Sequence, residues 1–330
     1  MQIVDNHELG YFGKLFTRLY EDVSNQDPKV GTVCFKDYPH EIKPFIEKVY
    51  PTENIVFDGN TEEIKKFKVE ENKKVLMGFS GGKDSTAVVL KLKKQGYEPI
   101  LFFVKGVNRA YPNEIDSAKI LAEKLDCPII IYEASYKGKM YYGENPIKNQ
   151  YILALMLDYG LQNDISMYCM GDCGKDSLQE ANRHYNWSDS QEMFIAFEKF
   201  VKSRFPQYKK LSIISGERDS YEEIILNGHE KLFPDILSCV LPYRYRRMRK
   251  EGNEKKFGIT LMKNRCGSCV KCCLDYIYFY RHGVVTPKDE KFYEHCINKL
   301  REKTLEVYGF KGNKLTEKEL LVLYGVEDED

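Results

Sequence analysis

The fold of this chain is decided by residues 75–90, VLMGFSGGKDSTAVVL. Residues 75–79 are mostly apolar, as in a buried strand, and residues 85–95 place apolar side chains at the spacing of a helix that Gly96 ends. Residues 80–85 lie between them, and we call this segment the glycine loop. Its glycines let the backbone turn tightly, and the N–H groups at the start of the next helix attract an anion. The stretch therefore predicts a strand, an anion-binding loop and a helix in succession.

The same alternation of short apolar runs and helical segments continues along the chain. We predict further strands at residues 99–104, 129–132, 165–170 and 211–215, and helices at residues 113–125, 147–159 and 190–205. Strands that alternate with helices pair in parallel, and the helices cover both faces of the sheet. We therefore expect an α/β fold with a doubly wound, mainly parallel five-stranded sheet.

The pattern divides the chain into three regions. Residues 73–240 carry the alternating strands and helices of the expected α/β domain. Residues 1–72 show no motif that carries chemistry, and we expect an N-terminal extension or small accessory layer that serves packing or a homodimer surface, with a partner-docking module as the alternative. Residues 241–330 combine a group of cysteines with two or three closing helices. Within them, residues 243–250 (YRYRRMRK) hold five cations, for which we expect a solvated loop, with a contact to RNA or phosphate as the alternative.

The overall charge argues against a chain that mainly coats nucleic acid or an anionic membrane. Among 330 residues, 50 lysines and arginines balance 50 aspartates and glutamates, so the formal net charge is zero. No run of eighteen apolar residues occurs, and the first ten residues lack the basic and apolar segments of an export signal. We therefore expect no membrane span and a cytoplasmic protein.

The side chains of the glycine loop suit a phosphate. Lys83 supplies a positive charge, and the hydroxyls of Ser80 and Ser85 supply hydrogen-bond donors. The loop differs from the phosphate loop of kinase-type NTPases, because Asp84 follows the lysine where those loops have serine or threonine. A turn that only joins a strand to a helix is the alternative.

The segment FSGGKDS, residues 79–85, resembles the SGGxDS motif of the N-type ATP pyrophosphatases, the PP-loop enzymes. The resemblance implies an adenine nucleotide alpha hydrolase-like fold and a reaction that adenylates an acceptor with ATP, releasing AMP and pyrophosphate. Carried over position by position, it implies these ATP-binding residues, of which the last three are also catalytic: Ser80, Gly81, Gly82, Lys83, Asp84 and Ser85. Asp84 would hold Mg²⁺. Val104, at the end of the second strand, would lie beside the adenine, because ligands bind at the carboxyl ends of parallel strands.

Closely spaced cysteines in the last region indicate a metal site. Cys266, Cys269 and Cys272 form C-x-x-C-x-x-C, and thiolates around one centre bind zinc before other metals. For the fourth ligand we choose Cys239 over Cys273, because a ligand from a separate segment closes a tetrahedron more easily than the neighbour of Cys272. An iron–sulfur cluster and a set of reduced core cysteines are the alternatives.

Together, the glycine loop and the cysteines resemble the 7-cyano-7-deazaguanine synthase family, whose zinc is held by four cysteines near the C-terminus. The resemblance spans roughly residues 73–280 and includes NPIKNQYILALMLDYG, residues 145–160. It implies an ATP-dependent, C–N bond-forming ligase that activates a heterocyclic carboxylate for attack by ammonia, giving an amide or a nitrile. Transfer of the deazaguanine to a nucleic acid or a protein is equally compatible. The chain departs from the family in a longer gap between Cys239 and Cys266.

Two other functions stay open. A PP-loop RNA thiolase would adenylate a base and deliver sulfur through Cys169 or Cys173. A non-catalytic relative would sense a nucleotide and signal through the cysteine segment. Two further strand ends carry Asp-Ser pairs, GDCGKDS at residues 171–177 and SGERDS at residues 215–220. Ordinary turn chemistry explains these pairs, and acceptor binding is the alternative.

Overall fold

The computed structural model describes residues 2–4, 9–26, 32–50, 54–60, 66–69, 72–105, 114–134, 145–171, 190–211, 217–237, 239, 241, 243–284, 289–308, 315–323 and 326. The chain forms two compact units. The first comprises Met1–Phe79, Leu92–Val107 and Cys127–Ile214, and the second comprises Ser80–Lys91, Asn108–Asp126 and Ser215–Asp330. The glycine loop therefore begins the second unit.

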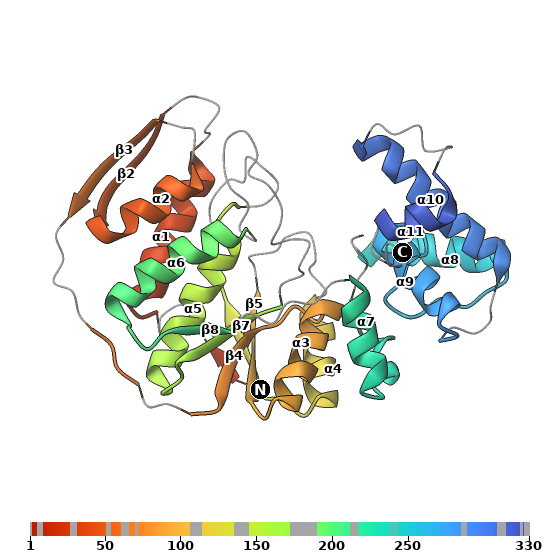
Figure 1. Ribbon diagram of the computed structural model, residues 1–330, viewed down its shortest axis with the longest axis horizontal. Helices are drawn as coiled ribbons and strands as arrows, with labels where there is room; N and C mark the ends of the chain where they lie inside the picture. Colours follow the sequence, from red (N-terminus) through yellow and green to blue (C-terminus); the bar gives the residue numbers. More distant parts are fainter. Residues whose placement is uncertain are drawn as a thin grey trace. The chain divides into compact units, whose positions relative to one another are not determined.

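The first unit is built on a sheet of six parallel strands in the order β1-β6-β5-β4-β7-β8. Figure 1 labels β4, β5, β7 and β8 of this sheet. The strands are β1 (Gln2–Val4), β4 (Lys74–Gly78), β5 (Glu98–Lys105), β6 (Ile129–Glu133), β7 (Met167–Met170) and β8 (Lys209–Leu211). The chain proceeds from β4 first to one side and then to the other, which is the strand order of a doubly wound sheet. The predicted α/β fold with five parallel strands is confirmed.

β1 is a sixth strand that the sequence did not predict. It has three residues and pairs in parallel with β6, with Gln2 opposite Ile130. A run this short shows no alternation of apolar and polar residues from which a strand is recognised. β8 begins at Lys209, two residues before the predicted start, and residues 212–215 of that prediction lie outside the described residues.

β4 is a central strand that leads into the glycine loop. Val75, Leu76 and Met77 are fully buried, and β4 pairs with β5 on one side and β7 on the other. Gly78 ends the strand opposite Met170, and a side chain at this position would meet Met170 Sδ at 2.6 Å. The strand order reverses direction between β4 and β7, which is where open α/β sheets bind ligands.

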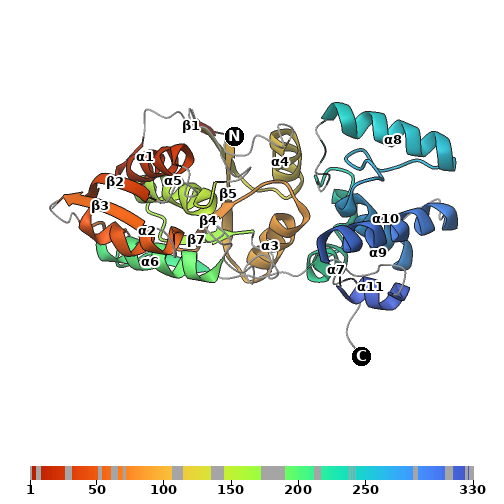
Figure 2. The same cartoon turned by 90° about the horizontal axis from the view of Figure 1, so that it is seen from above.

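The N-terminal region contributes to the core of the first unit. The helices of this unit are α1 (Tyr11–Asn25), α2 (Lys43–Val49), α5 (Lys148–Gln162) and α6 (Gln191–Arg204) (Figure 2). A second sheet consists of two parallel strands, β2 (Thr32–Pro39) and β3 (Asn54–Asn60). α1 packs on α5, and α2 packs on α6. Phe16 and Phe197 meet edge to face with ring centroids 5.1 Å apart. The region before β4 thus shares one buried aromatic core with the helices that follow it.

Asp158 of α5, which is far from α1 in the sequence, caps the start of α1 with its carboxylate. Its Oδ1 accepts a hydrogen bond from Phe12 N at 3.0 Å, and its Oδ2 accepts one from Gly13 N at 2.7 Å. Two N–H groups that lack an intrahelical acceptor are thereby satisfied. Burial raises the pKa of Asp158 to about 6, although these backbone hydrogen bonds lower it. The carboxyl is therefore harder to ionise in the folded chain than in the unfolded chain.

Asp158 should make stability depend on pH. Because its pKa rises from 3.8 to about 6 on folding, its contribution is full below pH 4 and is lost as the pH rises through 6. The amide of a D158N variant does not titrate, so the free-energy advantage of the wild type over this variant should shrink by about 2 to 3 kcal/mol between pH 4 and pH 7.5. Urea unfolding at each pH measures the difference. A difference that stays constant with pH would contradict the raised pKa.

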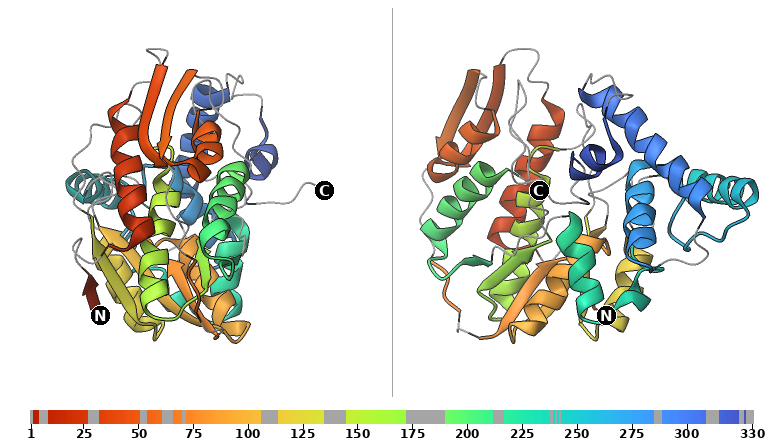
Figure 3. Two further views of the ribbon diagram at one scale, coloured as in Figure 1. Left: turned by 90° about the vertical axis from the view of Figure 1, so that its left-hand side faces the viewer. Right: turned by 45° about the vertical axis from the view of Figure 1, so that its right-hand side comes forward.

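The second unit is helical in its described residues. Its elements are α3 (Lys83–Lys94, which extends into the first unit), α4 (Glu114–Lys124), α7 (Glu217–Leu226), α8 (Tyr243–Phe257), α9 (Val270–Arg281), α10 (Glu290–Tyr308) and α11 (Glu317–Leu323), with a 3-10 turn at Glu230–Leu232. α9 packs on α10 (Figure 3). Tyr221 stacks on Tyr278 at a ring separation of 4.7 Å, and Phe233 contacts Phe279 at 4.5 Å. Among the described residues, no helix combines the length and apolar character needed to cross a bilayer.

The basic segment after Pro242 is a helix, so the prediction of a loop at residues 243–250 was wrong. α8 runs through the whole segment to Phe257. Arginine, lysine, methionine and glutamate are good helix formers, and this preference outweighs the lack of an apolar stripe. Ion pairs one turn apart add support, because Arg247 lies 2.7 Å from Glu251 and Lys250 lies 3.2 Å from Glu254.

Candidate functional site

Gly81 makes the turn of the glycine loop. Its φ is +74°, and a Cβ at this position would lie 2.9 Å from the backbone N of Ala118 in α4. Residues with a side chain avoid this backbone region, and here the side chain would also lack space. Leu237 N donates to Gly81 O at 3.0 Å and holds the other side of the turn. Conformation and packing therefore both require glycine.

α3 starts directly after this turn. Gly82 O accepts hydrogen bonds from Ser85 Oγ at 3.1 Å, Thr86 Oγ1 at 2.8 Å and Thr86 N at 3.0 Å. Ser80 Oγ accepts one from Gly82 N at 3.3 Å and lies 3.4 Å from Ser85 Oγ. These bonds hold the first turn of α3, where the N–H groups of a helix have no intrahelical acceptor and attract anions.

Asp84 is held by two donors. Lys83 Nζ at 2.8 Å and Ser220 Oγ at 2.6 Å both donate to Asp84 Oδ1. The Lys83 side chain is 6% exposed, and its ammonium lies 5.5 Å from the centroid of the Tyr221 ring. α7 carries Ser220 and Tyr221 and therefore positions both charged side chains of the loop. The Asp84 side chain is 26% exposed, so solvent and ligands reach it.

The predicted ATP-binding residues of the glycine loop belong to the second unit, and Val104 belongs to the first. Val104 belongs to β5, where it packs partly buried against the aromatic core. Its contact with an adenine stays a prediction.

Four cysteines of the second unit come together, and we call them the cysteine cluster: Cys239, Cys266, Cys269 and Cys272. Their Sγ atoms all lie within 4.8 Å of one another. The Sγ atoms of Cys266 and Cys272 are 3.7 Å apart, and those of Cys239 and Cys269 are 3.9 Å apart. These separations exclude disulfide bonds. Cys273 lies outside the cluster, with its Sγ 4.0 Å from Gly267 O.

The spacing of the sulfurs fits a tetrahedral zinc site. Zn–S bonds of about 2.3 Å place the sulfurs of a tetrahedron about 3.8 Å apart. Ser268 N and Cys269 N both donate to Cys266 Sγ at 3.3 Å, which stabilises a thiolate there. Gly267, with a φ of +66°, allows the chain to turn back around the sulfur. Four sulfur ligands would close the site and leave no position for a reacting water.

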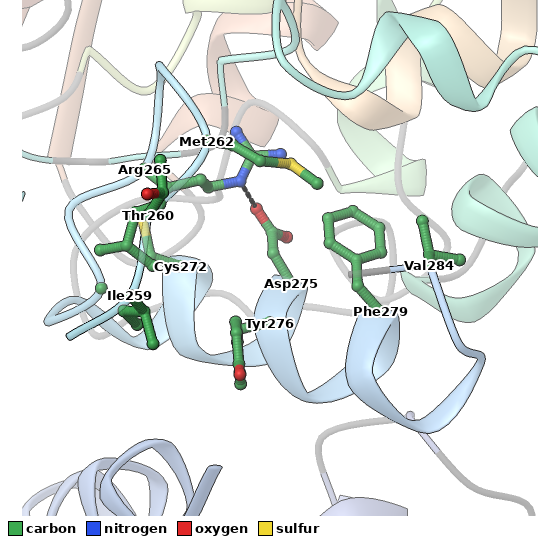
Figure 4. A pocket seen from close by; sticks show the side chains of 11 residues that line it. Ile259, Thr260, Met262, Arg265, Cys272, Asp275, Tyr276, Phe279 and Val284 are labelled. Carbon is green, nitrogen blue, oxygen red and sulfur yellow. Dashed lines mark ion pairs between the residues drawn. The ribbon is translucent and has the colours of Figure 1, made fainter. Parts of the chain in front are cut away.

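A buried ion pair lies beside the cysteine cluster (Figure 4). Arg265 Nε is 2.5 Å from Asp275 Oδ2, and the two side chains are 4% and 2% exposed. Both line a cavity of about 160 Å³ with the apolar side chains of Met262 and Phe279. Burial lowers the pKa of Arg265, while the neighbouring cysteine thiolates raise it. Arginine stays charged in proteins, so Arg265 offsets part of the negative charge that ionised cysteines carry.

Residues 235–237 support both the glycine loop and the cysteine cluster. Leu237 N donates to Gly81 O at 3.0 Å. The carbonyl of Ile236 accepts a hydrogen bond from Arg265 Nη1 at 2.6 Å. The segment then leads to Cys239, two residues further on. The cluster therefore anchors the backbone that holds the glycine turn.

Sequence reasoning missed Ser220, Tyr221 and the pair of Arg265 and Asp275. Ser220 ends the segment SGERDS, which we interpreted as an ordinary turn with a ligand contact as the alternative. Its hydroxyl in fact binds Asp84, so the Asp-Ser pair was the available signal. No motif marks Arg265 or Asp275, because their pairing depends on how the cysteine segment folds. Residues 172–177 of the other Asp-Ser segment lie outside the described residues.

Comparison with known proteins places the chain in a superfamily. It is 40% identical over 71 residues to the tRNA-specific 2-thiouridylase MnmA of Karelsulcia muelleri (strain GWSS), a match of 21% of this chain and 19% of that enzyme. The chain thus matches about a fifth of the length of this curated relative. Together with the SGGKDS turn, this match decides the superfamily. The chain is a PP-loop protein. PP-loop proteins share the adenine nucleotide alpha hydrolase fold, and no protein-family model matches this one.

Two solved structures are similar to parts of this PP-loop chain. The predicted subunit of tRNA methyltransferase from Methanocaldococcus jannaschii DSM is 19% identical, with 45% of this chain and 72% of that chain covered and a TM-score of 0.30. The NH3-dependent NAD synthetase from Campylobacter jejuni subsp. jejuni NCTC 11168, in complex with the nitrate ion, is 14% identical, with 75% and 90% covered and a TM-score of 0.33.

Proposed function

We propose that this protein is an ATP-dependent adenylating enzyme that splits ATP into AMP and pyrophosphate at the glycine loop. An acceptor oxygen attacks the α-phosphate, the bond to the β-phosphate breaks, and pyrophosphate leaves. The observation that carries this proposal is the turn at Gly81, directly after which α3 starts. The N–H groups at the start of a helix attract anions. Oriented N–H groups stabilise the charge that grows on the leaving pyrophosphate.

The charged side chains of the loop leave room for a cation. Lys83 and Asp84 pair with each other, so together they add no net charge to the site. Both donors engage Oδ1 of Asp84, which leaves Oδ2 as the oxygen that would hold Mg²⁺. The cation would supply positive charge to the phosphates. Ser220 keeps the carboxylate in one orientation, and Ser80 and Ser85 offer hydroxyls to the leaving group.

For the acceptor we propose a heterocyclic carboxylate, as in the 7-cyano-7-deazaguanine synthase family. Its carboxylate would displace pyrophosphate to form an acyl adenylate, and ammonia would then displace AMP to give an amide. A second adenylation, of the amide oxygen, would release AMP again and leave a nitrile. The cysteine cluster supports this choice, because it adds a second feature of that family to the glycine loop. Zinc in the cluster would hold the C-terminal helices together.

Thiolation of an RNA base is the second candidate, because the matched 71 residues belong to a tRNA 2-thiouridylase. This chemistry needs a cysteine that an outside sulfur donor reaches. Cys169 does not meet that need, since it is fully buried in β7. Cys173 lies outside the described residues. The thiolation candidate therefore depends on Cys173.

Incubation with ATP, Mg²⁺, ammonium and 7-carboxy-7-deazaguanine tests the proposal. AMP and pyrophosphate should form in equal amounts, and mass spectrometry should show the amide or nitrile. A parallel reaction with transcribed tRNA and a sulfur donor tests thiolation, which a C173S variant should abolish. If the protein bound nucleotide but formed AMP in neither reaction, adenylation would be contradicted and a nucleotide sensor would be favoured.

A Ser220→Ala variant should form AMP about tenfold more slowly, because residues that orient a metal-binding carboxylate typically contribute 10- to 100-fold. The rate of AMP formation at saturating ATP, measured over a series of Mg²⁺ concentrations, should show a higher Mg²⁺ requirement. A Ser203→Ala variant is the matched control, since its hydroxyl makes a similar 2.7 Å hydrogen bond to Phe200 O in α6. Equal rates for the two variants would remove Ser220 from the site.

A further inference from the structure

α8 concentrates positive charge in a chain that is neutral overall. Its 15 residues hold seven cations and two anions, a net charge of +5, so the rest of the chain carries −5. The cations are Arg244, Arg246, Arg247, Arg249, Lys250, Lys255 and Lys256. A charge imbalance of this size within one helix creates a local positive field that the average over the chain conceals.

One side of α8 is fixed to the cysteine cluster. Asn253 Nδ2 donates to Cys266 O at 2.9 Å and to Ser268 Oγ at 2.8 Å. Glu254 Oε1 accepts a hydrogen bond from Leu261 N at 2.8 Å. Arg246 points to the same protected side, with 5% of its surface exposed. The helix is therefore clamped, and its opposite side has a defined orientation in the second unit.

The opposite side of α8 mixes cations with large exposed side chains. Tyr245 is 58% exposed and Met248 is 56% exposed, two of the most exposed large apolar residues among those described. Arg244 is exposed one turn before Met248, and Arg249 is exposed one turn after Tyr245. Lys255 and Lys256 are exposed further along the helix. The surface therefore offers flat, apolar groups between positive charges.

We propose that this outer side of α8 binds a single-stranded nucleic acid. The arginines and lysines would contact successive phosphates, and Tyr245 would stack on an unpaired base, with Met248 packed against it. A membrane surface fits less well, because an interfacial helix buries a continuous apolar face, whereas α8 has only two apolar side chains among its exposed cations. The binding is independent of the adenylation reaction and goes beyond it.

The position of α8 in the chain supports a separate binding role. The helix occupies the gap between Cys239 and Cys266, so it interrupts the segment that supplies the cluster. The two ends of this insertion are held by the cluster, and a rigid base lowers the entropy lost when a flexible strand binds. Negative charge elsewhere on the chain would repel phosphates and confine binding to this helix.

The test is fluorescence anisotropy of labelled 12-nucleotide strands with the full-length protein, without ATP. If Arg244, Arg249, Lys255 and Lys256 each contact one phosphate, the logarithm of the binding constant should fall with the logarithm of the salt concentration with a slope near −2.8. The affinity should therefore fall about 50-fold between 50 and 200 mM salt. An R244Q/R249Q variant should bind about 25-fold more weakly at 100 mM salt and lose about half of the slope. A Y245A variant should bind at least about 5-fold more weakly, while Y245F, which keeps the ring, should bind like the wild type. The same measurement with RNA strands and with DNA strands shows which sugar the protein prefers.

A K231Q/K291Q variant removes the same charge from exposed lysines outside α8 and should bind like the wild type. Equal losses in this control and in R244Q/R249Q would overturn the proposal, because binding would then follow net charge alone. So would stronger binding of the protein to anionic phospholipid vesicles than to the strands, or an unchanged affinity in R244Q/R249Q. Circular dichroism confirms that each variant keeps its helices. Pyrophosphate release, measured separately, distinguishes a failure of this proposal from a failure of the adenylation proposal.

Discussion

A Cys266→Ala variant is expected to purify without bound metal and with its C-terminal helices unfolded. Structural zinc sites bind with apparent free energies of about 10 to 16 kcal/mol, which is comparable to or larger than the stability of a whole domain. Cys266 is fully buried, and it accepts two backbone hydrogen bonds in addition to its place in the cluster. Its loss therefore removes both a ligand and the centre of the turn. Elemental analysis should fall from one zinc per chain to none, and amide exchange in α9 should become fast.

Cys273→Ala is the matched control for that experiment. Cys273 is as buried as Cys266 and follows Cys272 directly, yet its sulfur lies outside the cluster. The variant should keep one zinc per chain and lose only about 1 to 2 kcal/mol of stability from the small cavity it leaves. Loss of zinc from C273A with retention in a C239A variant would reverse our assignment of the fourth ligand. If the wild type instead contained iron and acid-labile sulfide, the four cysteines would hold an iron–sulfur cluster and the assignment of zinc would be wrong.

The cysteine cluster should also influence nucleotide binding. Residues 235–237 hold Gly81 on one side and accept a hydrogen bond from Arg265 on the other. Once the cluster opens, this segment loses its anchor, so the C266A variant should bind ATP more weakly than C273A. Isothermal titration of both variants provides the comparison.

Gly81→Ala is expected to reduce AMP formation at least about 100-fold. The φ of +74° costs a residue with a side chain about 1 to 2 kcal/mol, and its Cβ would press on Ala118 N at 2.9 Å. One atom of this contact is the new Cβ and the other is a backbone nitrogen, so no side-chain rotation relieves the contact. The loop or α4 therefore has to move. A displacement of about 1 Å in a catalytic group lowers rates by roughly 100-fold. Single-turnover formation of AMP from labelled ATP measures the effect.

Gly96→Ala separates conformational strain from the collision. Gly96 has a φ of +81°, but a Cβ there meets nothing within 4 Å. G96A should therefore show only the loss of stability that comes from conformational strain in urea unfolding, G81A should lose more because of the collision, and only G81A should lose activity. If G96A lost as much AMP formation as G81A, the defect would reflect general destabilisation, and the glycine loop would not be the site of ATP cleavage.

The parts of this protein that were predictable from sequence are those in which local chemistry is decisive. Buried parallel strands form continuous apolar runs, so residues 75–79 and 99–104 were recognised without knowledge of their neighbours. The glycine loop was recognised because a strand, two glycines and a helix start follow one another directly. Pairing of Cys239 with the distant C-x-x-C-x-x-C segment was a hypothesis, and the structure brings those four sulfurs together.

The features that were missed depend on contacts between distant residues. β1 is a strand only because β6 offers it an edge. Ser220 reaches Asp84 across 136 positions of sequence, and Arg265 meets Asp275 only after the cysteine segment has turned back on itself. α8 was predicted to be a solvated loop, but its good helix formers and its ion pairs one turn apart make it a helix.

The sequence by itself determined the order of strands and helices from β4 to β8, the position of the glycine loop and the residues available to bind a metal, because each follows from the preferences of adjacent residues. Only the tertiary structure decided which donors hold Asp84, why position 81 admits no side chain, and how residues 235–237 connect the turn to the cysteine cluster. Such contacts join segments that are far apart in the sequence, and their formation depends on how the whole chain packs.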